Sequence, residues 1–462
     1  MRRNHCIGFI FLSLTVWSVV TYFLFLQRPL GTRFSEREAA VQQRLKELEQ
    51  GVRQQSADSE QLVRQLQRTV HQRQQLAVAD AVKRRVEDAE ADQLTDEEKL
   101  QQEKVRQLRA RAGQRLAGGA PVLAVLVFAC NRVTVSKCLD QLLRYRPSAQ
   151  QFPIVVSQDC AHQPTAGAIA AYGDRVFHIQ QPDQSEIVVL PKEKKFKGYY
   201  KISRHYGWAL NQTFFNFNFD TVIIVEDDLD VSPDLFEYFL GTYALLQRDP
   251  TLWCVSAWND NGKVGLVDEG APEMLHRTDF FPGLGWMLRR AVWEELAPKW
   301  PAAYWDDWIR QPEQRRGRAC IRPELSRTRT FGKVGVSNGH FYEKHLKFIK
   351  LNEKFVPFTQ MNLTYLLKDN YDQQFVKWVY ESPVVTYQEL KSGSVAHEGP
   401  VRIPYHTNDM YKRTAKMLGL MDDFRSGVPR TGYRGVVSFM YKGRRVFLAP
   451  NANWKGYDPG WS

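Results

Sequence analysis

The sequence predicts an α/β fold in which buried strands alternate with amphipathic helices, as in a parallel, helix-covered sheet of the nucleotide-binding type. Two observations support this prediction. Of the 462 residues, 43% are hydrophobic and 25% charged, with six cysteines, which excludes an intrinsically disordered chain, a collagen and a disulfide-rich miniprotein. After the Gly118-Gly119 break, short apolar runs alternate with helical patterns.

Each apolar run in this part of the chain predicts a strand, and each longer amphipathic stretch predicts a helix. Strands are expected at residues 122–129, 154–157, 176–179, 221–225 and 253–257. Helices are expected at residues 134–143, 199–215 and 235–247. Ligands of such a sheet bind beyond the carboxyl ends of its strands. Polar residues follow three of these strands, namely Asn131 and Arg132, Gln158 and Asp159, and Glu226 to Asp228.

The last hundred residues have a different pattern. Residues 436–441 and 444–448 are strand-like and flank a Lys442-Gly443 turn, which predicts a β-hairpin. We expect a smaller C-terminal α+β domain that begins near residue 369.

The N-terminus predicts a membrane anchor. Residues 6–26 are 21 consecutive uncharged residues, which matches the ~20 residues that a helix needs to cross a bilayer. Arg2 and Arg3 precede them, so we expect a cytoplasmic tail, a signal-anchor and a luminal remainder, the topology of a single-pass type II membrane protein. A cleaved signal peptide is the alternative, although no small-residue cleavage site follows the apolar run.

The segment from residue 27 to residue 118 predicts a helical stem. It is rich in Gln, Glu, Arg, Ala and Leu, and five apolar residues fall on one a/d frame: Leu45, Leu48, Val52, Leu62 and Leu66. A weak parallel coiled coil, with self-association through the stem, and a solvated single helix are both compatible with this pattern.

The net charge of +12 is compatible with nucleic acid, a membrane surface or an anionic substrate. The predicted luminal position of the basic chain excludes nucleic acid as a partner. An anionic diphosphate is the expected partner of the folded part.

Cysteine usage fits an oxidising compartment. Cys130 and Cys160 end two strands that should be neighbours, so a disulfide between them is sterically reasonable. Cys254 would then pair with Cys320, and Cys138 would remain a free thiol.

Three acids follow the buried strand at residues 221–225. Glu226, Asp227 and Asp228 repel one another unless a cation joins them, and carboxylate oxygens select Mg²⁺ or Mn²⁺. Such a cation would hold a diphosphate. The alternative is that these acids only lead into a helix that Asp230 or Ser232 caps.

A second acidic pair lies among aromatics in Trp305-Asp306-Asp307-Trp308. Aromatic faces stack on sugar rings, and a partly buried carboxylate is a better general base. The alternative is a helix start with an N-cap Asp in a small aromatic core.

Several longer motifs closely resemble the N-acetylglucosaminyltransferase I family of N-glycan processing, from about Val122 to the C-terminus. They are Ser157–Cys160, Lys197–His205, Val225–Asp228, Trp253–Gly262, Phe280–Trp286, Trp305–Trp308 and His345–Leu351. The resemblance implies a GT-A nucleotide-sugar fold, UDP-N-acetylglucosamine (UDP-GlcNAc) as donor and Mn²⁺ as cofactor. It also implies inverting β-1,2 transfer to the α-1,3-arm mannose of oligomannose N-glycans on glycoproteins, at the Golgi membrane.

The resemblance also implies roles for single residues. Arg132, Asp159, His205 and Asp227 would hold the nucleotide-sugar, and Ser337 would contact the diphosphate from a loop that closes over the donor. Glu226, Leu284 and Trp305 would line the N-acetylglucosamine pocket. Asp228 would bind the metal, and Asp306 would be the catalytic base.

These inferences divide the chain into segments. They are a tail (1–5), a membrane anchor (6–26), a stem (27–118), a catalytic domain (119–332), an active-site loop and linker (333–368) and a small C-terminal domain (369–462). One alternative is a related β-1,2-N-acetylglucosaminyltransferase that acts on protein O-linked mannose, whose stem would be globular. Another is an inactive membrane-tethered scaffold, which should have lost its acidic residues.

Overall fold

The computed structural model describes residues 13–23, 30–91, 95–114, 116–333, 335 and 339–461, in two compact units that divide after Lys99. In the first unit, α2 (Leu30–Ala91) is a single helix of 62 residues. Its a/d residues Leu45, Leu48 and Val52 are exposed. Whether copies of this helix pair as a coiled coil stays a prediction.

The expected membrane anchor at residues 6–26 lies only partly among the described residues, as a helix over residues 13–23. Within the described ranges, no helix is long and apolar enough to cross a bilayer.

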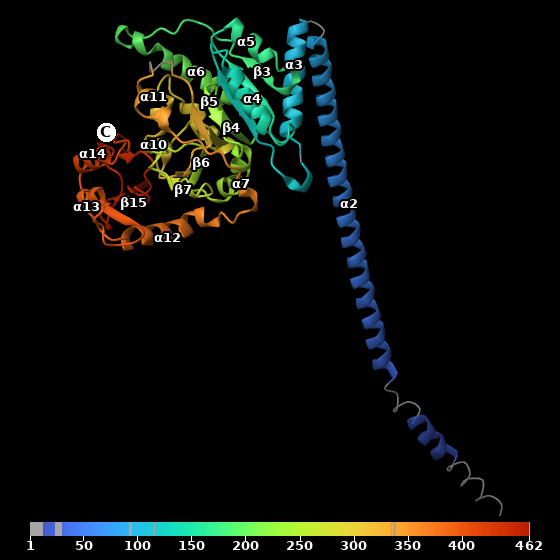
Figure 1. Cartoon of the computed structure of the whole chain (residues 1–462). Helices are drawn as coiled ribbons and strands as arrows, with labels where there is room; N and C mark the ends of the chain where they lie inside the picture. Colours follow the sequence, from blue (N-terminus) through green and yellow to red (C-terminus); the bar gives the residue numbers. More distant parts are fainter. Residues whose placement is uncertain are drawn as a thin grey trace, which may run out of the picture. The chain divides into compact units, whose positions relative to one another are not determined.

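The second unit is built on an eight-stranded sheet with the strand order β3-β2-β1-β4-β8-β6-β9-β7. Figure 1 labels β3, β4, β6 and β7 of this sheet. Its strands are β1 (Ala124–Ala129), β2 (Ile154–Gln158), β3 (Phe177–Gln180), β4 (Thr221–Glu226), β6 (Leu252–Ser256), β7 (Leu275–Thr278), β8 (Trp286–Arg289) and β9 (Ala319–Pro323). The five strands that the sequence predicts in this sheet are all present.

The sheet is mixed, so the expectation of a parallel sheet was wrong for β7 and β8, whereas β6 and β9 are parallel to each other. Strands β3, β2, β1 and β4 are parallel to one another, whereas β8 runs antiparallel to β4 and β6, and β7 runs antiparallel to β9. Neither β7 nor β8 is a long apolar run. β7 instead buries His276 and Arg277, which bond to Glu324 and Asp249. Buried polar pairs of this kind hide a strand from a hydrophobicity pattern.

Helices cover both faces of the sheet. They include α4 (Val135–Tyr145), α5 (Gln163–Ala170), α6 (Lys197–Asn211), α7 (Leu235–Arg248) and α8 (Arg290–Leu296). Alternate residues of β1 belong to two hydrophobic clusters: Val125 and Val127 pack with α4, α5 and α7, and Leu126 and Phe128 pack with α6 and α8. This two-sided burial explains why β1 is apolar at every position.

The last turns of the helix α3 (Asp96–Ala112) pack on the second of these clusters. Leu108 is fully buried there, and Arg109 donates to the carbonyl and side-chain oxygens of Asn216 at 2.6 and 2.7 Å. The sequence predicts a polar stem up to residue 118, whereas residues 100–112 belong to the second compact unit.

The C-terminal residues add a three-stranded sheet of β11 (Val401–Pro404), β15 (Arg444–Ala449) and β14 (Val437–Tyr441), which contains the predicted hairpin. Before it, α12 (Lys368–Glu381) buries Phe375 and Val379 in the same cluster as α4 and α7. The domain boundaries at residues 332 and 368 stay predictions.

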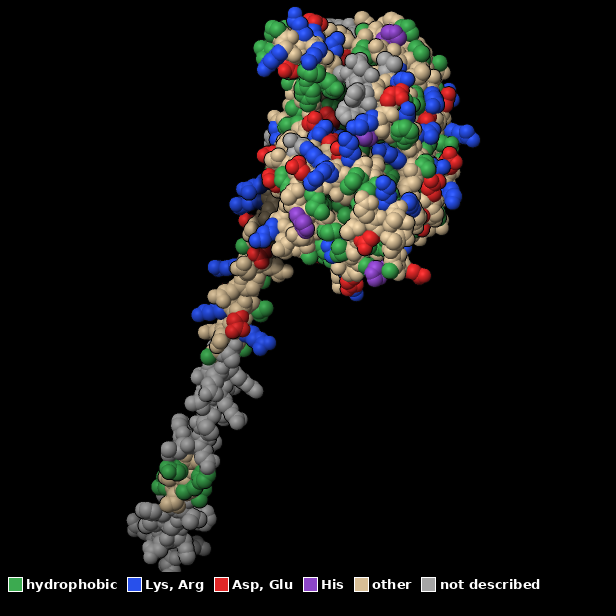
Figure 2. All heavy atoms as spheres, turned by 60° about the vertical axis from the view of Figure 1, so that its left-hand side comes forward, with side chains coloured by type: hydrophobic (Ala, Val, Ile, Leu, Met, Phe, Trp, Pro, Cys, Tyr) green, Lys and Arg blue, Asp and Glu red, His purple; other side chains and the backbone are tan. Residues whose placement is uncertain are grey.

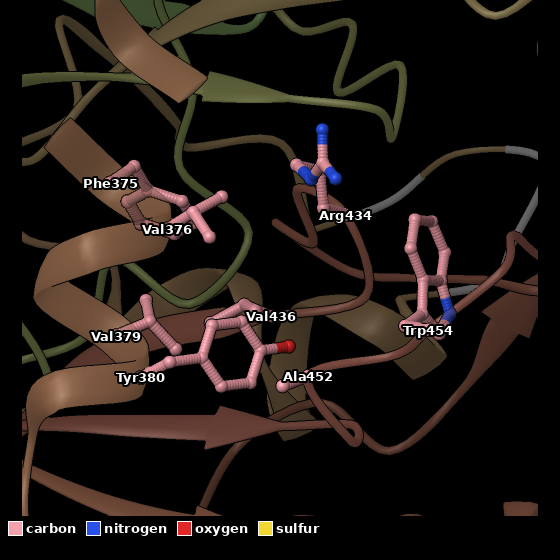
Figure 3. A pocket seen from close by; sticks show the side chains of 8 residues that line it. All are labelled: Phe375, Val376, Val379, Tyr380, Arg434, Val436, Ala452 and Trp454. Atoms are coloured by element: carbon pink, nitrogen blue, oxygen red, sulfur yellow. The ribbon is translucent and has the colours of Figure 1, made fainter. Parts of the chain in front are cut away.

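A narrow hollow lies between α12 and the C-terminal segment, lined by Phe375, Val376, Val379, Tyr380, Arg434, Val436, Ala452 and Trp454 (Figure 3). Its free volume is about 20 Å³, roughly the space of one water molecule. It is too small for a sugar or a nucleotide.

Two disulfides cross-link neighbouring strands. Cys130 joins Cys160 beyond the ends of β1 and β2, and Cys254 joins Cys320 between β6 and β9. Cys138 of α4 is a buried free thiol. This is the arrangement that the sequence analysis expects.

Candidate active site

The acidic residues after β4 lie at the carboxyl ends of the parallel strands β1 and β4. Glu226 pairs in register with Phe128 of β1, and the Asp227 amide donates to the carbonyl of Phe128 at 3.0 Å. Arg132 follows β1 a few residues later and comes from the same edge of the sheet. The ends of two adjacent parallel strands therefore bring a guanidinium to three carboxylates.

Arg132 bonds two of those carboxylates. Its Nη1 donates to Asp227 Oδ1 at 2.9 Å and to Asp228 Oδ2 at 2.7 Å. Burial raises the pKa of Asp227 to about 6, against the opposing effect of Arg132, and burial also raises the pKa of Asp228. Arg132 therefore supplies part of the positive charge that the sequence analysis attributes to a metal ion.

Asp228 lies under the segment that follows β10 (Thr328–Thr330). The Phe331 amide donates to the Asp228 carbonyl at 2.8 Å, and a Cβ on Gly332 would lie 2.0 Å from Asp228 Oδ2. A Cβ on Gly335 would lie 3.0 Å from an Arg132 nitrogen. Only glycine fits against Asp228, so the chain passes directly over its carboxylate. Ser337 lies outside the described residues.

The donor set fits a metal ion that the protein shares with a substrate. Among the described residues, no group of three His, Cys, Asp or Glu side chains could hold a metal ion. Asp228 is a single carboxylate of low exposure. Cations such as Mg²⁺ are commonly bound by one or two carboxylates and completed by phosphate oxygens and water. The residues therefore fit a divalent cation held between Asp228 and a diphosphate, not a closed protein cage.

The Glu226 carboxyl lies against an aromatic stack. Tyr206 donates its hydroxyl to Glu226 Oε1 at 2.7 Å, and its ring stacks on Phe128 at 3.8 Å and on Trp305 at 4.5 Å between centroids. Burial and then the charge of Asp228 raise the pKa of Glu226 to about 7. Tyr206 therefore fixes the position of a carboxyl whose pKa burial raises well above its usual range.

Leu284 lies in a strained turn between two glycines. It has a φ of 51°, and the flanking Gly283 and Gly285 have φ values of 71° and 91°. Its carbonyl accepts from Thr328 Oγ1 at 2.5 Å, and a Cβ on Gly285 would lie 2.6 Å from the methyl group of Thr328. A bulky residue in this region of φ and ψ is unusual and points to a functional constraint.

Asp306 lies in the short helix α9 (Trp305–Ile309). Its side chain is 47% exposed, and Arg310 Nη1 donates to Asp306 Oδ2 and to Asp307 Oδ1, both at 3.1 Å. Trp305 is buried, so an aromatic core is present, but neither Asp is the N-cap, which is Tyr304. The N-cap alternative is therefore wrong, and Asp306 presents an anchored, accessible carboxylate.

Asp159 follows β2, and the His205 ring of α6 lies 5.0 Å from the Phe128 ring of β1 between centroids. His205 Nε2 and Ser157 Oγ are 2.7 Å apart, and Asp159 Oδ1 accepts from Gln184 at 2.9 Å. Burial lowers the pKa of His205 to about 4, and the charge of Asp159 opposes this shift. His205 is therefore a neutral side chain at physiological pH.

The structure thus brings Arg132, Asp227 and Asp228 into one ion-pair group, and it links Glu226 to Trp305 through Tyr206. Sequence reasoning missed three residues that act on these groups: Tyr206, Arg310 and Gly332. Arg310 could have been found, because it follows Asp306 by four residues, the spacing of one helical turn. Tyr206 and Gly332 carry no comparable local signal.

Comparison with known proteins identifies the family. A model of the GNT-I family matches residues 39–461. The chain belongs to the GNT-I family. An Arabidopsis thaliana relative, alpha-1,3-mannosyl-glycoprotein 2-beta-N-acetylglucosaminyltransferase, is 41% identical over 334 residues, which are 72% of this chain and 74% of the relative.

Solved structures resemble this GNT-I family member more distantly. A glucosyl-3-phosphoglycerate synthase from Mycobacterium tuberculosis, in complex with Mn²⁺, UDP and glucosyl-3-phosphoglycerate, is 15% identical, with 52% of this chain and 80% of that chain covered and a TM-score of 0.32. A mannosyltransferase from Pyrobaculum calidifontis, in complex with GDP-Man and Mn²⁺, is 16% identical, with 41% and 52% covered and a TM-score of 0.27. Similarity at these TM-scores carries no argument about this chain.

Proposed function

We propose that this GNT-I family member transfers N-acetylglucosamine from UDP-GlcNAc, in β-1,2 linkage, to the α-1,3-arm mannose of oligomannose N-glycans. This reaction starts hybrid and complex N-glycan synthesis, and the proposal includes a GT-A fold. The observation that carries it is the continuous series of groups at one sheet edge: Arg132 with Asp227 and Asp228, then Glu226, Tyr206 and Trp305, then Asp306.

The donor fits the first part of this series. Arg132, Asp159, His205 and Asp227 would hold the nucleotide and its diphosphate, and Ser337 would contact the diphosphate. Glu226, Leu284 and Trp305 line the pocket for the N-acetylglucosamine ring. A neutral His205 is suited to stacking on the nucleobase or hydrogen bonding to it, and the Arg132 guanidinium is suited to hydrogen bonding to phosphate oxygens.

Asp228 would hold the divalent cation, and we propose Mn²⁺. When bound, the cation neutralises charge that develops on the departing diphosphate. The bulk of any side chain at Gly332 would displace the Asp228 carboxylate, so this site depends on a residue that has no side chain.

Asp306 accepts the proton of the mannose 2-hydroxyl as that oxygen attacks the anomeric carbon. The new bond forms as the bond from the anomeric carbon to the UDP oxygen breaks, so the configuration inverts and UDP leaves with the bonding electrons. The transition state is oxocarbenium-like, as in inverting glycoside hydrolysis. Arg310 keeps the Asp306 carboxylate oriented toward the acceptor side.

We further propose that the protein is a single-pass type II protein of the Golgi membrane, anchored through residues 6–26. The uncharged run and the preceding arginines support this topology. The helix α2 would form the stem and is the part through which copies of the chain could associate.

The experiment is a donor and acceptor panel with the full chain. UDP-GlcNAc, UDP-glucose, UDP-galactose and UDP-GalNAc are each incubated with an oligomannose N-glycan or an O-mannosyl peptide, in Mn²⁺ or in EDTA. We expect transfer only from UDP-GlcNAc to the N-glycan, and only with the metal. Transfer from another donor, transfer to the peptide instead, or activity in EDTA would overturn the corresponding part of the proposal.

A further inference from the structure

A cluster of partly exposed aromatic rings flanks the helix that carries Asp306. Tyr199 and Tyr304 stack at 4.9 Å between centroids with an angle of 29° between their planes. Phe196 lies 6.5 Å from Tyr199 and 6.3 Å from Tyr304, and Tyr200 lies 6.4 Å from Tyr304. All four side chains are of intermediate exposure, so these rings are not simply part of a closed core.

The cluster comes from the same two elements as the stack of Tyr206 and Trp305. Tyr199 and Tyr206 lie seven residues apart on α6, about two helical turns, and so share one helix face. Tyr206 stacks on Trp305, and Tyr304 is the residue before Trp305 at the start of α9. The Tyr199–Tyr304 pair is therefore a second contact between α6 and the start of α9.

The cluster lies next to the carboxylate of the proposed base, because Tyr304 precedes Asp306 by two residues at the start of α9. Burial raises the pKa of Tyr199, and the charges of Asp306 and Asp307 raise it further, which agrees with this placement. An acceptor sugar must approach Asp306 from a side that the donor does not occupy, and the partly exposed rings of Tyr199 and Tyr304 can contact such a sugar.

Tyr304 adopts a backbone conformation that disfavours its own side chain. Its φ of 53° and ψ of 42° lie in the left-handed region, which costs a bulky residue free energy and which glycine adopts readily. A strained aromatic residue beside a catalytic group is retained only if the surrounding structure or a ligand uses its ring. Its ring contacts the other members of the cluster, and its hydroxyl hydrogen-bonds the side chain of Glu193.

We propose that Tyr199 and Tyr304 form a stacking platform for a pyranose ring of the acceptor glycan, next to the mannose that reacts at Asp306. The proposal rests on the proposed function and deepens it by locating part of the acceptor site. Pyranose rings present a face of C–H bonds that packs on aromatic rings, while their hydroxyls remain in water. A half-exposed pair of tyrosines beside a general base offers that combination.

A second hollow, lined by aromatic side chains, is the alternative place for the acceptor glycan. It has a free volume of about 230 Å³ and is lined by Tyr405, His406, Trp454, Tyr457, Trp461 and neighbouring residues. Two of its tyrosines are held by hydrogen bonds, from Tyr457 to Asp279 at 2.6 Å and from Tyr405 to the Gly435 carbonyl at 2.7 Å. We place the acceptor at the Tyr199–Tyr304 platform because Tyr304 lies two residues before Asp306, and we use Trp454 as the comparison.

The test compares Tyr304→Gly, Tyr199→Ala, Tyr199→Phe and Trp454→Ala in the full chain. Tyr304→Gly removes the ring and also relieves the backbone strain, so the variant should fold. We expect Tyr304→Gly and Tyr199→Ala each to raise the KM for oligomannose about five- to tenfold, which corresponds to the loss of one aromatic stacking contact. The KM for UDP-GlcNAc should stay within about twofold of wild type, a limit below a meaningful loss of binding. Tyr199→Phe and Trp454→Ala should behave like wild type.

An unchanged acceptor KM in Tyr304→Gly, or equal losses for donor and acceptor, would overturn the platform. So would a raised acceptor KM in Trp454→Ala with none in the tyrosine variants. Absence of transfer by the wild-type chain would instead overturn the proposed function. As a binding readout independent of turnover, saturation-transfer NMR of the glycan with Asp306→Asn should show contact that Tyr304→Gly weakens in the same background.

Discussion

Asp306 has the two properties that a base for a bulky acceptor needs. Its carboxylate is about half exposed, so a sugar can reach it, and Arg310 fixes its orientation. The residue is far less buried than Asp227 or Asp228, whose carboxylates pair with Arg132. The two acidic motifs of the sequence therefore offer carboxylates of different exposure.

The first prediction concerns Asp306→Asn. Loss of the base should reduce transfer by about 10²–10⁴-fold, while UDP affinity stays nearly unchanged because the donor contacts Arg132 and its neighbours. Single-turnover transfer and calorimetric UDP binding measure the two effects. If both were lost together, Asp306 would be structural, and an unchanged transfer rate would exclude it as the base.

Gly332→Ala tests how the chain covers Asp228. The new Cβ would lie 2.0 Å from Asp228 Oδ2, so the carboxylate must move away from Arg132. We expect UDP-GlcNAc affinity in Mn²⁺ to fall by at least about tenfold, as in Asp228→Ala. Gly167→Ala is the matched control, because a Cβ there meets no atom within 4 Å. Equal donor affinity in both variants would contradict the contact.

His205 predicts part of the acid sensitivity of the protein. Its pKa falls from 6.5 to about 4 because burial disfavours the charged ring. Below about pH 6.5 the unfolded chain binds a proton that the folded chain refuses, so stability decreases as the pH falls toward 4. In His205→Gln, thermal unfolding midpoints should depend less on pH over this range and match the wild-type slope above it. An identical acid slope in the variant would mean that His205 is protonated in the fold.

Among the elements, strands that carry an unbroken apolar run could be predicted from the sequence. β1, β2 and β4 each begin within two residues of the expected position, because burial on both faces makes their residues mostly apolar, with polar residues only at the ends of β2 and β4. β7 and β8 could not be predicted. β7 buries the His276–Glu324 and Arg277–Asp249 pairs, and the partners that compensate these buried charges are recognisable only in the folded structure. The acidic motifs could be predicted as a site, but the Tyr206 bridge between them depends on α6 lying against α9.

The helix α3 gives a prediction at this scale. Its residue Leu108 is fully buried in the cluster of α6 and α8, whereas Leu100, two turns earlier, is 55% exposed. Leu108→Ala should therefore reduce the free energy of unfolding by about 2–5 kcal/mol, and Leu100→Ala should have little effect. Denaturant titration of both variants decides this. Equal small effects would show that α3 is only a stem helix.

Across the whole molecule, one hydrophobic cluster spans regions far apart in the chain. Phe375 of α12 packs against Tyr371, Tyr433 and Phe447 and shares its cluster with Val127 and Val225 of the central strands. The C-terminal residues thus support the strands whose ends carry the acids. On the surface, Lys and Arg are interspersed with Asp and Glu over the face in Figure 2.

This shared core predicts cooperative unfolding. Phe375→Ala should lower the free energy of unfolding by about 3–5 kcal/mol, and UDP binding should be lost at the same denaturant concentration as the fluorescence of the C-terminal tryptophans. Phe355, which is 62% exposed, provides the control substitution. Two separated transitions would show that residues 369–462 unfold as an independent domain.

The thiol of Cys138 gives the site an internal reporter. It is fully buried in α4 with its Sγ 3.7 Å from the carbonyl of Glu226, and burial together with Asp227, Asp228 and Asp230 raises its pKa far above the usual value. Among the described cysteines the other four are in disulfides. The rate at which a maleimide modifies this sulfur in native solution therefore measures how often α4 separates from the segment that carries the acidic residues. No label needs to be engineered into the chain.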